Sequence, residues 1–123
     1  MRRSRSTSNP TSYERDWLVA VKAGGCICCL AMGFGPRRDE EPPVVEAHHL
    51  LRGGIRIGHL STVGLCLWHH RGRLIVEGWT HVMHRLRLGP SLAEGSKPFH
   101  EAFGSDEELL AAQHRLIEQQ RAA

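Results

Sequence analysis

The sequence predicts a small α+β fold: two short strands and a short helix at the centre, with one further helix toward each end. Three observations predict it. Capping boxes followed by apolar residues at helical spacing occur near both ends of the chain. Two short segments rich in β-branched residues lie between them. Two pairs of metal-ligand residue types, both spaced i, i+3, flank these segments and indicate that a metal ion stabilises the core.

The composition limits the core that a chain of 123 residues can build. Aromatic residues make up 6% of it, and 13 glycines and 6 prolines favour turns, so we expect a cross-link to supplement the core. Four cysteines can provide it as two disulfides or as metal ligands. No apolar run has the length of a signal peptide or a membrane span, so we expect a cytoplasmic protein that no membrane holds. There, Cys-x-x-Cys beside histidines favours zinc, and a secreted, disulfide-linked protein is the alternative.

Positive charge is concentrated at the start and in the middle of the chain. Arginine accounts for 14 of the 16 basic residues and suits bidentate phosphate contact. Residues 52–87 carry six of these arginines and five of the nine histidines, which favours a polyanionic partner such as DNA. Arginines that only solubilise the domain are the alternative. The start is basic and serine-rich, so we expect residues 1–12 to be a disordered basic arm and residues 13–123 to be the folded domain.

The N-terminal half predicts one helix and two strands. Thr11 and Glu14 form a capping box for a helix that Gly24-Gly25 ends. The apolar face of this helix carries Trp17, Leu18 and Val21. Residues 26–29 predict a tight turn, residues 33–43 a loop, residues 44–49 the first strand, residues 52–58 a loop, and residues 59–65 the second strand.

The C-terminal half predicts helices joined by loops. Residues 66–70 begin a turn or a short helix, and residues 73–79 fit no single class. Thr80 caps a helix over residues 81–88, and residues 89–104 predict a loop because they begin with Gly-Pro and are rich in glycine. Ser105 and Glu108 form the second capping box and open a final helix. One face of this helix carries Leu109, Leu110, Leu116 and Ile117.

Four residues predict a structural zinc site: Cys26, Cys29, Cys66 and His69. Zinc takes four nitrogen or sulfur ligands in a tetrahedron, and short spacing lets one turn present two of them. Two half-sites with the same spacing predict such a site far more strongly than one. Buried free cysteines are the alternative. Cys28 remains, and it replaces Cys29 only through the rarer Cys-x-Cys spacing.

The remaining histidines predict a catalytic site. His48 and His49 end the first strand, where neighbouring side chains point to opposite faces, so they suit two different roles. One imidazole can bind a cation while the other deprotonates water. His70 directly follows a zinc ligand and can turn toward the same cation as His48. A structural role for any single histidine is the alternative.

Two motifs resemble known nucleases. The pattern C-x2-C … HH … LC-x2-HH resembles the HNH nucleases, whose fold is ββα-metal. The runs GLCLWHHRG and GPSLAEGSKPFHEAFGSDEELL resemble the Ref-type (recombination enhancement) RecA-dependent nucleases of phages and prophages. The resemblance covers about residues 17–117. It implies a zinc-stabilised ββα-metal core within the α+β fold and a protein that acts in the cytoplasm of a bacterial cell.

The resemblance also implies an activity and roles for single residues. His49 matches the general base, and His48 and His70 match the ligands of a catalytic divalent cation, which is Mg²⁺, Mn²⁺ or a second Zn²⁺. The implied reaction is hydrolysis of a DNA phosphodiester by an endonuclease or nickase. The implied substrate is DNA engaged by a RecA–single-stranded DNA filament. A catalytically inactive zinc module that binds DNA or a partner protein is the alternative.

The sequence departs from the HNH pattern at two places. The middle asparagine is missing, since Asn9 is the only asparagine, and His59 lies near its position. His59 can orient the base or bind metal. A third ligand for the catalytic cation is open among His81, which we rank first, His84, His100 and water.

Four basic residues around the site are predicted to bind DNA phosphates. They are Arg52, Arg56, Arg71 and Lys97.

Overall fold

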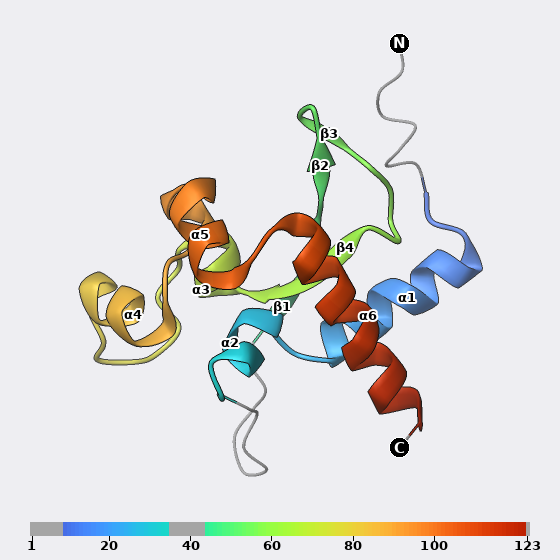
Figure 1. Ribbon diagram of the computed structural model, residues 1–123. Helices are drawn as coiled ribbons and strands as arrows, with labels where there is room; N and C mark the ends of the chain where they lie inside the picture. Colours follow the sequence, from blue (N-terminus) through green and yellow to red (C-terminus); the bar gives the residue numbers. More distant parts are fainter. Residues whose placement is uncertain (1–8, 35–43, 123) are drawn as a thin grey trace.

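The computed structural model describes residues 9–34 and 44–122 (Figure 1). Its first element, helix α1 (Ser12–Ala23), begins and ends as predicted. Thr11 Oγ1 accepts a hydrogen bond from the Glu14 amide at 3.1 Å, and Glu14 Oε1 accepts from the Thr11 amide at 2.8 Å. The predicted capping box is therefore confirmed. Most of the predicted basic arm, residues 1–8, lies outside the described residues.

Helix α2 (Ile27–Ala31) follows α1 after Gly24 and Gly25. The sequence predicts a tight turn here, and the structure shows a helix of five residues with Cys26 as its N-cap. The predicted loop over residues 33–43 falls mostly on residues 35–43, which lie outside the described part of the chain.

The central sheet pairs β1 (Val45–His49) with β4 (Thr62–Cys66) in antiparallel register, from Val45 opposite Cys66 to His49 opposite Thr62. Both strands are confirmed, although the second begins three residues later than predicted and leaves His59 in the preceding loop. All five residues of β4 are buried. Helix α3 (Leu67–Arg71) follows β4 directly, as predicted for residues 66–70.

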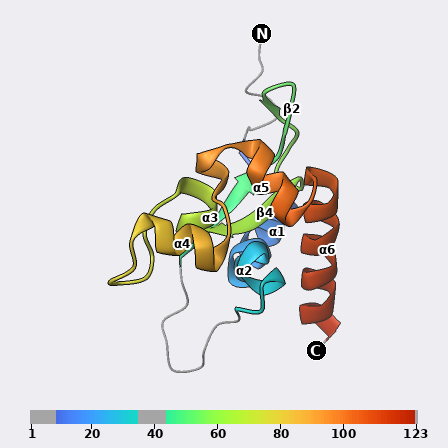
Figure 2. The same ribbon diagram turned by 60° about the vertical axis from the view of Figure 1, so that its left-hand side comes forward.

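A β-hairpin replaces the loop predicted over residues 52–58. Strands β2 (Leu51–Arg52) and β3 (Ile55–Arg56) pair with each other and project from the body of the molecule (Figures 1 and 2). Gly53 and Gly54 both have positive φ, 61° and 79°, which is the backbone of a two-residue hairpin turn. The glycines that suggested a loop are the residues that this turn requires.

Helix α4 (His81–Leu88) is confirmed, with Thr80 Oγ1 accepting from the Met83 amide at 3.1 Å. The loop predicted over residues 89–104 is wrong. This segment forms the short 3-10 helix η2 (Leu92–Glu94) and the helix α5 (Ser96–Phe103). Pro98 is compatible with α5 because it lies in the first turn, where the amide needs no helical partner. Phe99 is buried and Phe103 packs on the core, so the aromatic pair at i, i+4 fixes this helix.

Helix α6 (Asp106–Ala122) ends the described chain and opens with the predicted capping box. Its buried residues are Leu109, Gln113 and Ile117, while the predicted Leu110 and Leu116 are only partly buried. Gln113 belongs to this face because its Oε1 accepts from the Gly64 amide at 2.8 Å. The described helices include none with the length and apolar character of a membrane span.

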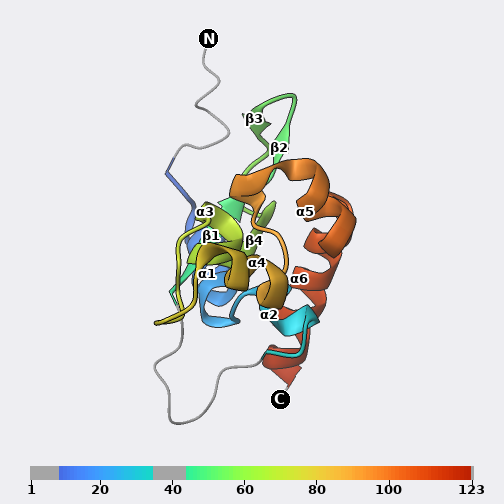
Figure 3. The same cartoon turned by 90° about the vertical axis from the view of Figure 1, so that its left-hand side faces the viewer.

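The helices divide over the two ends of the central sheet. Helices α3, α4 and α5 gather at one end, and α1 and α6 pack at the other (Figures 1 and 3). The described chain is thus a small α+β fold with six α-helices and two two-stranded sheets. The main core lies between β4, α2, α3 and α5, and a second cluster joins α1 to α6 through Trp17, Val21 and Ile117.

Candidate metal centre and active site

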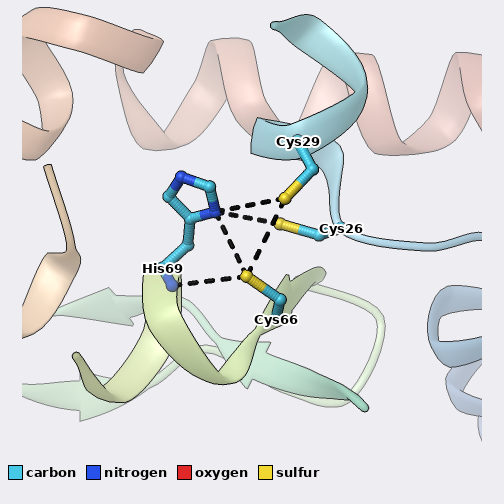
Figure 4. A group of neighbouring side chains, drawn as sticks. All are labelled: Cys26, Cys29, Cys66 and His69. Carbon is cyan, nitrogen blue, oxygen red and sulfur yellow. Dashed lines mark hydrogen bonds between the residues drawn. The ribbon is translucent and has the colours of Figure 1, made fainter. Parts of the chain in front are cut away.

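The predicted zinc ligands converge in the core (Figure 4). Nδ1 of His69 lies 3.4 Å from the sulfur of Cys26, 3.6 Å from that of Cys29 and 3.3 Å from that of Cys66. The sulfurs of Cys29 and Cys66 are 3.9 Å apart. Helix α2 and its N-cap supply two ligands, and the junction of β4 with α3 supplies the other two. Among the described residues this is the only set of three or more Cys, His, Asp or Glu side chains with ligand atoms this close.

These distances fit zinc and do not fit a disulfide. Tetrahedral bonds of about 2.3 Å to sulfur and about 2.0 Å to nitrogen place sulfur and nitrogen about 3.5 Å apart, and two sulfurs about 3.8 Å apart. The observed distances agree with both values to within a few tenths of an ångström. A disulfide requires a sulfur–sulfur distance of about 2.05 Å, and all four cysteines are free. The alternative of a disulfide-linked protein is therefore not supported.

A hydrogen bond orients the histidine ligand. His69 Nε2 lies 2.7 Å from the backbone oxygen of Leu88, which can only accept a hydrogen bond. The ring therefore carries a proton on Nε2, and Nδ1, which faces the three sulfurs, is the nitrogen that can bind a metal. Histidine ligands of structural metals are usually fixed in this way by their second nitrogen. The donor set and its orientation are consistent with a zinc ion held by four protein ligands.

The four side chains also perturb one another's protonation. Burial disfavours the charged form of His69, but hydrogen bonds to Cys26 and Cys66 raise the pKa of its ring to about 10. Hydrogen bonds to the sulfur of Cys26, first from Cys28, hold the pKa of the Cys26 thiol below its usual range. The pKa of Cys29 is raised, first by its hydrogen bond to Cys26. Protons are thus shared within the cluster, and a divalent cation that binds there displaces them.

Cys28 is not part of this ligand set. Its side chain is 1% exposed and packs in the hydrophobic core beside the cluster. The pKa of its thiol is raised by its hydrogen bond to Cys26 and by burial, so it stays protonated. The structure therefore selects the Cys-x2-Cys pair over the Cys-x-Cys alternative.

His48 of β1 and His70 of α3 lie side by side. Their ring centroids are 5.0 Å apart. Glu46 Oε1 lies 2.8 Å from His70 Nδ1 and accepts a second hydrogen bond from Arg71 Nε at 2.8 Å. Burial opposes ionisation of Glu46, but the bonds to His70 and Arg71 lower its pKa, so it remains a carboxylate. A His70 ring that donates from Nδ1 keeps the lone pair of Nε2 available to a cation.

The surroundings of His48 keep it neutral. Burial, followed by the charge of His70, lowers the pKa of His48 to about 4. A neutral imidazole is the form that binds metals. Glu46 was not predicted from the sequence, although it stands two residues before His48, and the alternation of a strand places both on one face.

His49 pairs with His59, close to where the missing asparagine was expected. His49 Nε2 and His59 Nδ1 are 3.0 Å apart. Burial lowers the pKa of His49, and the charges of Arg56 and His59 lower it further. Thr62 Oγ1 donates to the backbone oxygen of His59 at 3.0 Å and accepts from Trp17 Nε1 at 2.9 Å. Helix α1 thus anchors the loop that holds His59 against His49.

One histidine of each pair lines a common cleft, whereas His48 and His59 are not among its lining residues. The cleft has a volume of about 480 Å³, and both His49 and His70 line it. Three cationic side chains line the same cleft: Lys22, Arg56 and Arg71. Lys22 was missed because it lies in α1, far from the histidines in sequence. Arg52 is exposed on the β2–β3 hairpin and Lys97 is exposed on α5, and neither lines this cleft.

The structure does not bring the proposed third ligands to His48 and His70. His81 packs on Trp68, with ring centroids 4.9 Å apart, and its Nε2 lies 3.7 Å from Glu94. His84 is buried and both its nitrogens are engaged, since Nε2 accepts from the Ile75 amide at 2.9 Å and Nδ1 lies 2.9 Å from the Thr80 oxygen. His100 Nδ1 lies 2.8 Å from the Gly104 oxygen, and its Nε2 faces Asp106 at 3.4 Å.

Comparison with protein families decides the identity of the chain. The sequence model of the family described as "Recombination enhancement, RecA-dependent nuclease" matches residues 10–118, which include both histidine pairs and all four cysteines. The chain belongs to this family of RecA-dependent nucleases. No curated protein and no solved structure matches it.

Membership confirms the predicted family of RecA-dependent nucleases. A nuclease hydrolyses phosphodiester bonds of a polyanionic substrate, and the described residues include a cleft lined by histidines and cations. The Cys/His centre lies in the core of the same domain and can hold a metal ion, consistent with zinc.

Proposed function

We propose that the chain is a metal-dependent DNA endonuclease or nickase of the HNH type. The observation that carries the proposal is the cleft in which His49 and His70 meet Lys22, Arg56 and Arg71. The order of elements supports it: two antiparallel strands, β1 and β4, are followed directly by α3, which is the sequence of elements in a ββα-metal unit. Cys26, Cys29, Cys66 and His69 hold a structural zinc in this proposal.

His48 and His70 are the proposed protein ligands of a second divalent cation, Mg²⁺, Mn²⁺ or Zn²⁺. When bound, this cation stabilises negative charge on the scissile phosphate and on the leaving oxygen. Glu46 holds the His70 ring so that Nε2 is free to bind. Three histidines considered as a third ligand lie elsewhere, so we propose that water completes the shell.

The chain's own residues carry the proton transfer and bind the substrate. His49 is the proposed general base, and burial together with Arg56 keeps it neutral and able to accept a proton from water. His59 holds the His49 ring in position, in place of the asparagine of other HNH proteins. Lys22, Arg56 and Arg71 neutralise phosphates on both sides of the cut.

The proposed substrate is DNA engaged by a RecA–single-stranded DNA filament, such as a displacement loop. The family description supports a link to RecA. The cationic cleft supports a polyanionic substrate, independently of that description.

The test compares wild type with His49→Ala on supercoiled DNA and Mg²⁺, with and without RecA–single-stranded DNA filaments. Glu118→Ala on α6 is the control, because this side chain is exposed and outside the cleft. We expect His49→Ala to lower the cleavage rate at least about 100-fold and the control to cleave like wild type. Equal cleavage by wild type and His49→Ala refutes the assignment of His49 as the general base, and no cleavage by wild type under any of these conditions leaves the inactive zinc module.

A further inference from the structure

Neither face of the β2–β3 hairpin is buried against the rest of the described chain. Leu51 pairs with Arg56 and Arg52 pairs with Ile55, so each face of the ribbon carries one apolar side chain and one arginine. All four residues are exposed, and the apolar pair keeps 50% of Leu51 and 42% of Ile55 open to solvent. A hairpin whose only role was to connect β1 to β4 would not need an exposed apolar side chain on each face.

The hairpin is preorganised for a narrow partner surface. Gly53 and Gly54 form its tip with positive φ, and a Cβ added at either would meet no atom within 4 Å. The tip is therefore bare backbone with free space around it. Ile57 and Leu60, on the return segment, are 41% and 40% exposed and continue the apolar surface toward the sheet.

Charge and position identify the partner. Residues 50–61 contain two arginines and no acidic residue. The hairpin begins two residues after His49, and Arg56 at its base lines the cleft with that histidine. A ligand whose backbone lies in the cleft therefore continues along the hairpin. A surface that combines phosphates with apolar sugar and base edges matches arginines and aliphatic side chains on the same ribbon.

We propose that the β2–β3 hairpin is a finger that enters a groove of duplex DNA beside the phosphate to be cut. Arg52 and Arg56 contact phosphates of the groove walls, and Leu51 and Ile55 pack on sugars and base edges. A two-stranded ribbon has the dimensions for the major groove of B-DNA. The proposal rests on the proposed function insofar as the cleft binds DNA, and it adds that the bound DNA is double-stranded at this point.

The test measures binding, so that it does not depend on cleavage. A His49→Ala parent is titrated with a labelled duplex of about 20 base pairs and with the corresponding single strand at several salt concentrations. We expect R52Q/R56Q to lower the slope of log K against log salt by about 1.8, or about 0.9 for each phosphate that is no longer neutralised. We expect L51T/I55T to weaken duplex binding about tenfold at an unchanged slope, with a smaller effect on the single strand.

Two matched controls isolate the hairpin. Leu86→Thr changes a leucine on α4 that is 77% exposed, and Arg121→Gln removes an exposed arginine near the end of α6. Both are expected to bind like the parent. Thermal melts check that every variant keeps its fold, as expected for substitutions of exposed residues.

Two results would overturn the proposal. One is duplex binding by L51T/I55T as tight as the parent's, because the aliphatic side chains would then contribute nothing to DNA binding. The other is a combination of two results for both hairpin variants. They bind duplex like the parent, but in a cleavage-competent background RecA filaments no longer stimulate their DNA cleavage. The hairpin would then contact protein and not DNA. If wild type fails to cleave any DNA while the hairpin variants still lose duplex affinity, the proposed nuclease function fails and the hairpin proposal stands.

Discussion

Removal of one zinc ligand tests the metal centre most directly, because a near-identical control lies next to it. Cys29→Ala deletes a sulfur that lies 3.6 Å from His69 Nδ1 and 3.9 Å from the sulfur of Cys66. Cys28→Ala deletes the neighbouring sulfur, which is buried in the core and lies outside the ligand set. The two variants lose the same atoms from adjacent positions of α2 and differ in whether a metal ligand is removed.

The expected magnitudes differ widely. A structural zinc contributes about 10–16 kcal/mol of apparent binding free energy, whereas a whole domain is stable by about 5–15 kcal/mol. Loss of zinc is therefore enough to unfold the domain, because α2 and the β4–α3 junction are tied together through this centre. Loss of the Cys28 sulfur costs about 1 kcal/mol for a small cavity. A cost of this size shifts Tm by about 4 °C in a domain of this length.

The assay combines metal analysis with thermal unfolding followed by circular dichroism. We expect one zinc per chain in wild type and in Cys28→Ala, and little zinc with no cooperative melt in Cys29→Ala. A Cys29→Ala protein that keeps its zinc and melts within a few degrees of wild type would refute the assignment. Loss of zinc from Cys28→Ala alone would instead establish the Cys-x-Cys pair.

Three further predictions concern single side chains. His59→Ala should lower kcat about 100-fold with little change in KM. His59→Asn should recover at least about tenfold of that loss in single-turnover cleavage. If the asparagine variant cleaves no faster than the alanine variant, His59 does not position His49. Gly64→Ala should lower the free energy of unfolding in urea by about 2 kcal/mol, because the new Cβ would lie 2.8 Å from the backbone oxygens of Val21 and Gly25; a change below about 0.5 kcal/mol would contradict this packing. Gln113→Leu should cost about 1–3 kcal/mol and speed hydrogen exchange of the amide of residue 64, whose acceptor it removes, whereas unchanged exchange would show that another group accepts that bond.

The parts of the fold that could be predicted from the sequence depend on local spacing. The capping boxes at Thr11 and Ser105 act within one helical turn, and both form. The Cys-x2-Cys pair and the Cys66–His69 pair also depend on a single turn each. Only their meeting needed the tertiary fold, and the matched spacing of two half-sites was enough to predict it.

The parts that could not be predicted depend on contacts distant in sequence. Helix α5 contains a proline and follows a glycine, and it forms because Phe99 and Phe103 pack on the core. Lys22 reaches the cleft only because α1 packs beside β1. The position of His81 likewise depends on how α4 lies against α3, where it contacts Trp68. Residue type alone made it a reasonable candidate ligand.

His69 and His70 show how one short helix serves two sites. Consecutive residues of a helix point about 100° apart, so α3 directs the two rings to different sides. His69 is fully buried, and a backbone oxygen fixes its second nitrogen, which suits a closed site that exchanges nothing with solvent. His70 keeps 22% of its side chain exposed at the cleft, and a carboxylate fixes its second nitrogen. A carboxylate partner makes the ring a stronger ligand than a backbone oxygen does, which suits the proposed second metal site. The Cys/His centre therefore positions α3, and through α3 it positions the His70 ring in the cleft.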